Sequence, residues 1–239
     1  MLTKNQVAYG LAALLLVAVV GIAAGPALGA VMAPALPGGA TNVFYGTFAN
    51  AGPGMSGGSI SWINDNDLSQ YVYGTTIQPA IFAETSPTDV SGPGPNPSTL
   101  FGPINLIRVW VWQDLVDNYP PGWVVAPTSI TIKSDYTGGN DTDYYTITAN
   151  NFATTIGTFT PTWVDYGVAS GNYHYLYADI PVSIAPTNAV YLNLGTPSGA
   201  SGEFLVPEIQ AANVPEPASL ALLAAGGLLL LGRRRAVHH

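Results

Sequence analysis

Short stretches in which apolar and polar residues alternate dominate the middle of the chain. In residues 129–133, Ile130 and Ile132 face one side and the polar residues between them face the other, which is the period of a half-buried strand. Residues 104–112 (INLIRVWVW) are apolar on both faces, as a central strand covered on each side would be. Three further segments repeat the strand pattern: 144–148, 173–179 and 190–194.

Clusters of Gly, Pro, Asn and Ser separate these segments, as turns would. The clusters lie at 91–97, 119–122, 137–141, 169–172 and 196–202. No stretch within 41–212 has a convincing helical period, and residues 59–212 therefore predict one all-β domain, an antiparallel jelly-roll β-sandwich. The segment 31–58 is rich in Gly, Pro and Ala, and within it only Asn42–Phe48 alternates as a short first strand would.

Residues 1–30 read as an export signal. Lys4 provides a weak positive start, residues 11–22 an apolar segment, and Gly25-Pro26 ends that helix before small residues. We expect cleavage after Gly29 or Ala30, and an uncleaved N-terminal anchor is the alternative. Export machinery is then the first partner that the sequence implies.

The tail, residues 213–239, has three zones in a fixed order. A Pro-flanked acid comes first, an apolar segment at 220–231 second, and a block of arginines last. Proline fixes φ and keeps the residue before it extended, so Glu216 should be exposed. The motif residues are Val214, Pro215, Glu216, Pro217, Ala218, Ser219, Arg233, Arg234 and Arg235.

This tail resembles the PEP-CTERM sorting signal of exported bacterial proteins. The resemblance implies recognition and cutting near Pro-Glu-Pro by an exosortase-type membrane enzyme, and delivery to the cell surface or extracellular matrix. The apolar segment is shorter than the ~20 residues of a comfortable membrane span, which favours transient insertion and a processed signal over a permanent anchor. An ordinary C-terminal anchor is the alternative.

Charge and cysteine content narrow the classes of function. The chain has no cysteine, which excludes disulfides and thiolate metal sites. Residues 31–213 carry thirteen acidic residues and only two basic ones, Arg108 and Lys133, so this part of the chain has a net charge of −11. Such a charge disfavours nucleic acid as a partner, because that affinity depends on Lys and Arg neutralising phosphates.

The order of motifs in the body resembles the galactose-binding-like sandwiches, the discoidin or coagulation-factor C-type family of jelly rolls. The loop 62–71 (WINDNDLSQY) is similar to A-V-D-G-[DN]-x-x-T-x-W, and 104–110 is similar to I-x-x-I-R-V-W. Residues 127–132, 190–194 and 207–210 fall where that family has its later strands. The chain departs from the family pattern at Asn64, Asp65 and Tyr71, which replace Asp, Gly and Trp.

The loop 64–69 is the best candidate for a metal site. Its run of oxygen-bearing side chains suits calcium, which takes six to eight oxygen ligands. The resemblance implies a structural calcium held between this loop and Glu208 of the last strand, and a polar surface turn is the alternative. The candidate ligands are Asn64, Asp65, Asn66, Asp67, Ser69 and Glu208.

Other polar residues give weaker signals for chemistry. His174 lies between two tyrosines without a serine elbow elsewhere in the chain, and we expect it to be packed or hydrogen-bonded. The pair Asp114 and Asp117, and the acidic loop that runs from Asp135 to Asp143, are expected to be solvated or structural.

Aromatic residues are the remaining candidates for ligand contact. Trp110 and Trp112 share one strand face and should be core, whereas Trp123 and Trp163 lie at loop edges where a ring can stack on a sugar. The sequence therefore predicts a non-enzymatic, exported surface or matrix protein with a candidate face for extracellular polysaccharide. The alternatives are a secreted glycan-active enzyme of jelly-roll type and a structural surface protein that self-assembles.

Overall fold

A computed structural model describes residues 31–50, 55–74, 77–83, 99–114, 126–137, 147–170, 173–195 and 203–215. The chain divides into two compact units, Met1–Val31 and Met32–His239, and all the elements described below belong to the second. The predicted export helix and the apolar segment of the tail lie outside the described residues. None of the helical turns in the described ranges is long and apolar enough to cross a membrane.

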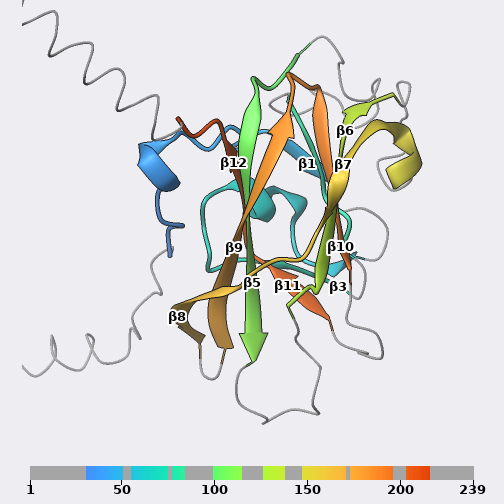
Figure 1. The fold of residues 1–239 in the computed structure, drawn as a ribbon. Coiled ribbons are helices and arrows are strands. Elements are labelled where there is room, and N and C mark those ends of the chain that lie inside the picture. The colour runs from blue at the N-terminus through green and yellow to red at the C-terminus, as the bar shows by residue number, and fades with distance from the viewer. Residues whose placement is uncertain are drawn as a thin grey trace, which may run out of the picture. The chain divides into compact units, whose positions relative to one another are not determined.

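The described strands form two antiparallel sheets (Figure 1). The five-stranded sheet runs in the order β1 (Phe48–Asn50), β4 (Ala80–Phe82), β10 (Ala189–Gly195), β6 (Ser129–Tyr136) and β7 (Phe152–Phe159). The seven-stranded sheet runs β2 (Met55–Gly57), β3 (Val72–Gly74), β11 (Phe204–Val206), β5 (Ile104–Asp114), β9 (Tyr173–Ile184) and β8 (Val164–Ser170), and β12 (Ile209–Ala212) also pairs with β5. The helical elements described are short 3-10 turns, η1 (Pro37–Gly39), η2 (Ile60–Asn64) and η4 (Ala149–Asn151). The all-β antiparallel sandwich predicted from the sequence is confirmed.

Most of the predicted strands are present. The segments predicted at 104–112, 129–133, 173–179 and 190–194 all lie within β5, β6, β9 and β10, and most of these strands extend further than the pattern indicated. The segment 31–58, which we set apart from the domain, contributes β1 to one sheet and β2 to the other.

The prediction of a first strand at 42–48 is wrong, because polar side chains close a turn there instead. The Asn42 side-chain oxygen Oδ1 accepts the Phe44 N–H at 3.1 Å, and the Thr47 hydroxyl donates to the Phe44 carbonyl at 2.7 Å. Gly46 has φ +67°, a backbone conformation that glycine adopts readily. Local side-chain bonds of this kind compete with strand pairing, and β1 begins only at Phe48.

The strand predicted at 144–148 is not seen in its described part. Residues 147 and 148 are extended but unpaired and lead into η4, where Thr148 and Asn151 form a reciprocal capping box. The remainder of that segment lies outside the described residues.

The main core fills the space between the two sheets. It takes alternate residues from both, including Ile107, Val109 and Val111 of β5 and Ile130 and Ile132 of β6. Each of these side chains is fully buried. A smaller cluster, with Phe82, Tyr136, Phe152 and Tyr191, covers the other face of the five-stranded sheet.

The outer face of the seven-stranded sheet carries a layer of aromatic rings. Trp110 is fully buried there, although it belongs to neither of the two apolar clusters. Tyr166 packs edge-on against it with ring centroids 5.3 Å apart, and Tyr177 lies 5.0 Å away on the opposite strand. Its indole N–H donates to Gln210 Oε1 at 3.2 Å. This layer explains why β5 is apolar on both faces, as we predicted.

Both basic residues of the body are held by other groups. The Arg108 guanidinium forms two hydrogen bonds with the Asp179 carboxylate, at 2.6 and 2.9 Å, and lies over the Tyr177 ring. The Lys133 ammonium donates to the Ala149 carbonyl at 2.5 Å. Arg108 is therefore paired with an acid, whereas Lys133 bonds a neutral backbone carbonyl.

The end of the sandwich is fixed by the side chain of Asn105. Asn105 Nδ2 donates to the Val214 carbonyl and the Val214 N–H donates to Asn105 Oδ1, both at 2.7 Å. The folded body is therefore ordered by specific bonds up to the residue immediately before Pro215.

Candidate functional site

Three segments that are far apart in the sequence meet around Glu208, which precedes β12. The Glu208 side chain is fully buried. Its Oε2 accepts the Asn66 N–H at 2.8 Å, and its Oε1 accepts Asn42 Nδ2 at 3.3 Å. The structure thus brings Glu208 next to the loop 64–69, and it adds the segment around Asn42, which the sequence did not indicate.

The Asn42 side chain links all three segments. Its Nδ2 donates to Asn66 Oδ1 at 2.9 Å as well as to Glu208, while its Oδ1 accepts the backbone N–H groups of Phe44 and Ala211. Gln210 Nε2 also donates to Asn66 Oδ1, at 3.1 Å. Asn66 itself has φ +64°, a conformation that asparagine tolerates better than most residues. We refer to Asn42, Asn66, Glu208 and Gln210 as the amide network.

Asn64 is buried and serves the neighbouring turn. Its Nδ2 donates to the Phe44 carbonyl at 2.9 Å, to the Thr47 carbonyl at 2.7 Å and to Thr47 Oγ1 at 3.2 Å. Because one amide group satisfies three acceptors, Asn64 holds residues 44–47 against the end of η2.

The other residues of the loop bond to one another. Asp65 Oδ1 accepts the Asp67 N–H at 2.8 Å, and Asp67 Oδ1 accepts both the N–H and the hydroxyl of Ser69. Asp67 Oδ2 accepts Gln70 Nε2 at 3.0 Å. These are the local bonds by which Asp and Ser stabilise turns.

Burial sets the protonation behaviour of the acids at this junction. Desolvation raises the pKa of Glu208 well above its ordinary value, although the Asn66 N–H opposes the shift and the charge of Asp65 adds to it. Desolvation also raises the pKa of Asp65. A carboxyl group whose pKa is higher in the folded state stabilises the fold most at low pH, and that stabilisation decreases as the pH rises from the unfolded-state to the folded-state value.

The arrangement around Glu208 differs from what a calcium ion would need. Calcium is surrounded by oxygen atoms, and its carboxylate ligands are ionised. Here N–H groups of Asn42, Asn66 and Gln210 donate to the oxygens of Glu208 and Asn66, so these oxygens already accept hydrogen bonds. The described residues also contain no cluster of three or more acidic or histidine side chains that could hold a metal. As arranged, these residues do not fit the ion, and the calcium site stays a prediction from the sequence.

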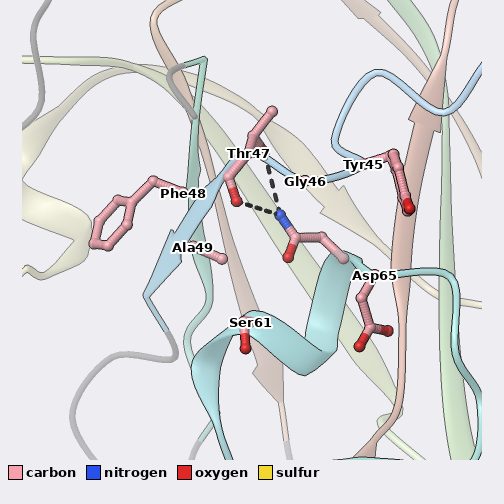
Figure 2. Close-up of a pocket in the computed structure, with 8 residues that line it drawn as sticks. Tyr45, Gly46, Thr47, Phe48, Ala49, Ser61 and Asp65 are labelled. Atoms are coloured by element: carbon pink, nitrogen blue, oxygen red, sulfur yellow. Dashed lines mark hydrogen bonds between the residues drawn. The ribbon is translucent and has the colours of Figure 1, made fainter. Parts of the chain in front are cut away.

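A pocket opens beside this junction, between the turn 45–49 and η2 (Figure 2). Its volume is about 480 Å³, within the ~300–1,000 Å³ typical of small-molecule sites. Figure 2 shows Tyr45 and Asp65 toward one end of the pocket and Phe48 toward the other. The residues that line it are Tyr45, Gly46, Thr47, Phe48, Ala49, Ser61, Asn64 and Asp65.

The pocket combines two aromatic rings, those of Tyr45 and Phe48, with a few polar groups. Tyr45 is 58% exposed, so its ring is accessible to a ligand. Ser61 is exposed, and its hydroxyl lies 3.1 Å from that of Ser59. The sequence prediction included Asp65 but missed Tyr45 and Ser61, because the alternation at 42–48 suggested that Tyr45 belonged to a strand.

The other candidate residues lie elsewhere. Trp163 is partly buried against the main core, and its indole N–H donates to the Pro127 carbonyl at 3.0 Å. His174 Nδ1 lies 2.9 Å from Asp165 Oδ2, so the expectation of a hydrogen-bonded histidine is confirmed. Trp123, Asp117 and the end of the acidic loop at Asp143 lie outside the described residues.

Comparison with known families identifies the tail. Residues 213–235 match the PEP-CTERM protein-sorting motif. The chain therefore carries the signal of an exported protein that is sorted through its C-terminus, as the sequence predicted. No curated protein sequence matches the chain.

Comparison with solved structures finds bacterial carbohydrate-binding modules. The chain is similar to chitosan-binding module 1 of a chitosanase/glucanase from Paenibacillus sp. IK-5, with 15% identity, 73% of this chain and 99% of that chain covered, and a TM-score of 0.42. It is similar to CpGH89CBM32-4 of Clostridium perfringens in complex with GlcNAc-α-1,4-galactose, with 12% identity, coverage of 74% and 97%, and a TM-score of 0.39. A structure of the Streptococcus pneumoniae β-galactosidase BgaA matches with 11% identity, coverage of 73% and 99%, and a TM-score of 0.40.

Proposed function

We propose that this protein is a non-enzymatic component of the bacterial cell surface or extracellular matrix, and that its sandwich binds carbohydrate in the pocket beside Tyr45. The observation that carries the proposal is the pocket itself, where an exposed tyrosine, a carboxylate and a hydroxyl surround a volume suited to one or two sugar units. An exosortase-type enzyme would recognise the tail and release the body into the polysaccharide layer.

The chemistry of the lining suits a sugar. A pyranose ring has C–H groups on its faces and hydroxyl groups around its edge, so it needs an apolar ring for the face and polar atoms for the edge. Tyr45 offers the ring. Tyrosine has an apolar ring and a polar hydroxyl group, so it suits a site that is apolar on one side and solvated on the other. The Asp65 carboxylate accepts hydrogen bonds, and the Ser61 hydroxyl both donates and accepts.

A binding role is favoured over hydrolysis by the acids that line the pocket. Most glycoside hydrolases hold the sugar between two carboxyl groups at a defined separation. Among the described residues that line this pocket, Asp65 is the single acid. We therefore infer that the site holds sugar without cutting it.

Replacing Tyr45 with alanine should abolish sugar binding and leave the fold intact. The ring is exposed, so its loss should change the free energy of unfolding by less than about 0.5 kcal/mol. Glycan-array binding and thermal melting of the full-length chain, purified in a detergent that is not a glycoside, would measure both effects. Tyr45→Phe, which keeps the ring, is the matched control and should bind. Unchanged binding by Tyr45→Ala would place the sugar elsewhere on the molecule.

Replacing Glu216 with glutamine should block removal of the tail. The substitution keeps the size and the extended backbone that the two prolines impose, and it removes the one acid of the motif. The measurement is the mass and location of the protein in its native host, with Glu203→Gln as a control for the loss of one acid. Normal processing of Glu216→Gln would mean that the enzyme does not read this charge.

A further inference from the structure

The charge in the lining of the pocket is negative. Asp65 lines it, and Asp67 lies close enough to interact electrostatically with the Asp65 carboxylate. None of the lining residues is basic. The potential at this end of the pocket is therefore negative, and the net charge of −11 over residues 31–213 reinforces it.

Neither basic residue of the body lies in the lining of the pocket. Arg108 is paired with Asp179 on the outer face of the seven-stranded sheet, and Lys133 bonds the Ala149 carbonyl. Backbone N–H groups bond the half-buried Asp65 carboxylate, and no basic side chain among the described residues forms an ion pair with it. An ammonium group on a ligand could therefore form a charge-assisted hydrogen bond with this carboxylate.

The second lining group also favours a cation. The face of a tyrosine ring attracts an ammonium group within about 6 Å of its centroid. Tyr45 and Asp65 lie toward the same end of the pocket (Figure 2). One ligand that has a sugar ring and an ammonium group could thus use the tyrosine face and the carboxylate together.

We propose that this pocket selects a sugar unit with a free, protonated amino group, such as a 2-amino-2-deoxyhexose, over neutral and acidic sugars. This inference rests on the proposed function, since it requires that the pocket binds sugar at all. The ammonium group would donate to the Asp65 carboxylate, and the ring would lie against Tyr45 with its hydroxyl edge toward Ser61. An acidic sugar would place a second carboxylate in a site where no cation can compensate its desolvation.

Four monosaccharides test the proposal: glucosamine, N-acetylglucosamine, glucose and glucuronic acid. They would be titrated by calorimetry into the full-length protein in EDTA, at about pH 6, where an amine with a pKa near 7.7 is protonated. We expect glucosamine to bind about tenfold more tightly than N-acetylglucosamine, the fold-change of one charge-assisted hydrogen bond. Glucuronic acid should bind most weakly.

The substitution Asp65→Asn should bring the ratio of glucosamine to N-acetylglucosamine affinity close to one. It keeps an oxygen to accept the Asp67 N–H, so the loop should retain its shape. Asp165→Asn, which removes an equal charge on β8 outside the pocket and keeps an acceptor for His174, is the matched control and should preserve the ratio. The melting temperatures of both variants would confirm that they fold.

The outcomes separate this inference from the function on which it rests. Binding of none of the four sugars would overturn the proposed function. Equal binding of glucosamine and N-acetylglucosamine would overturn the selectivity for an amino group. An affinity ratio of these two sugars that Asp65→Asn leaves unchanged would do the same. Neither result would contradict sugar binding in the pocket. Preferred binding of glucuronic acid would also refute the selectivity for an amino group.

Discussion

Replacing Trp110 with alanine is expected to lower the free energy of unfolding by about 3–5 kcal/mol. The side chain is fully buried, packs against the rings of Tyr166 and Tyr177, and donates its indole N–H to Gln210. Its loss would leave a cavity on the outer face of the seven-stranded sheet and would remove the donor to Gln210 Oε1 in the amide network. Urea unfolding followed by circular dichroism would measure the effect.

Two further variants resolve the contribution of the aromatic layer. Trp110→Phe keeps an apolar ring and loses the N–H, so it should cost less than the alanine variant. Tyr166→Ala uncovers Trp110 but removes a half-exposed ring, and we expect a loss of roughly 1–2 kcal/mol. If Trp110→Ala and Tyr166→Ala had the same free energy of unfolding, the buried ring of the aromatic layer would contribute no more to stability than the half-exposed one.

Replacing Asn42 with alanine should cost roughly 2–4 kcal/mol, although Asn42 is only partly buried. The substitution removes four hydrogen bonds at once and leaves the N–H of Ala211 and the oxygens of Asn66 and Glu208 without these partners. The cost of unpaired buried polar groups exceeds the value of the bonds that joined them, which is why one side chain has so large an effect. Chemical unfolding at about pH 7 would give the value.

The variant Asn42→Asp tests how the three segments are held together. It keeps an oxygen for the N–H groups of Phe44 and Ala211 but places a carboxylate against Glu208 and Asn66 Oδ1. Without calcium it should be at least as unstable as Asn42→Ala, and added calcium should restore much of its melting temperature, because the oxygens would then suit a hard cation. The unmodified protein should melt at the same temperature in calcium and in EDTA. A lower melting temperature of the unmodified protein in EDTA would support the calcium site predicted from the loop 64–69.

The fold was predictable because strand periodicity is local. The two-sided apolar pattern of β5 identified the central strand, and the alternation of β6, β9 and β10 identified strands with one buried face. The pattern failed at 42–48, where alternation is present but Asn42 and Thr47 bond the nearby backbone and close a turn. Periodicity alone does not distinguish these cases, because it does not include hydrogen bonds from side chain to backbone.

The candidate site was predictable only in part. The resemblance placed Glu208 near the loop 64–69, and the structure does bring Glu208 to Asn66. The role of Asn42 depends on a contact across 166 residues, and nothing in the local sequence marks it. Trp163 was chosen for its loop position, but its N–H and one side of its ring are used in packing, whereas Tyr45 is left exposed by the turn.

The pair of hydrogen bonds between Asn105 and Val214 limits how the tail can be processed. Glu216 follows Val214 by two residues, and an extended chain spans at most about 3.5 Å per residue, so this acid lies within about 7 Å of the clamped strand end. A membrane enzyme that reads Pro-Glu-Pro would therefore bind its motif within two residues of a hydrogen-bonded end of the sandwich. We expect the active site of such an enzyme to be wide enough to admit this end of the sandwich.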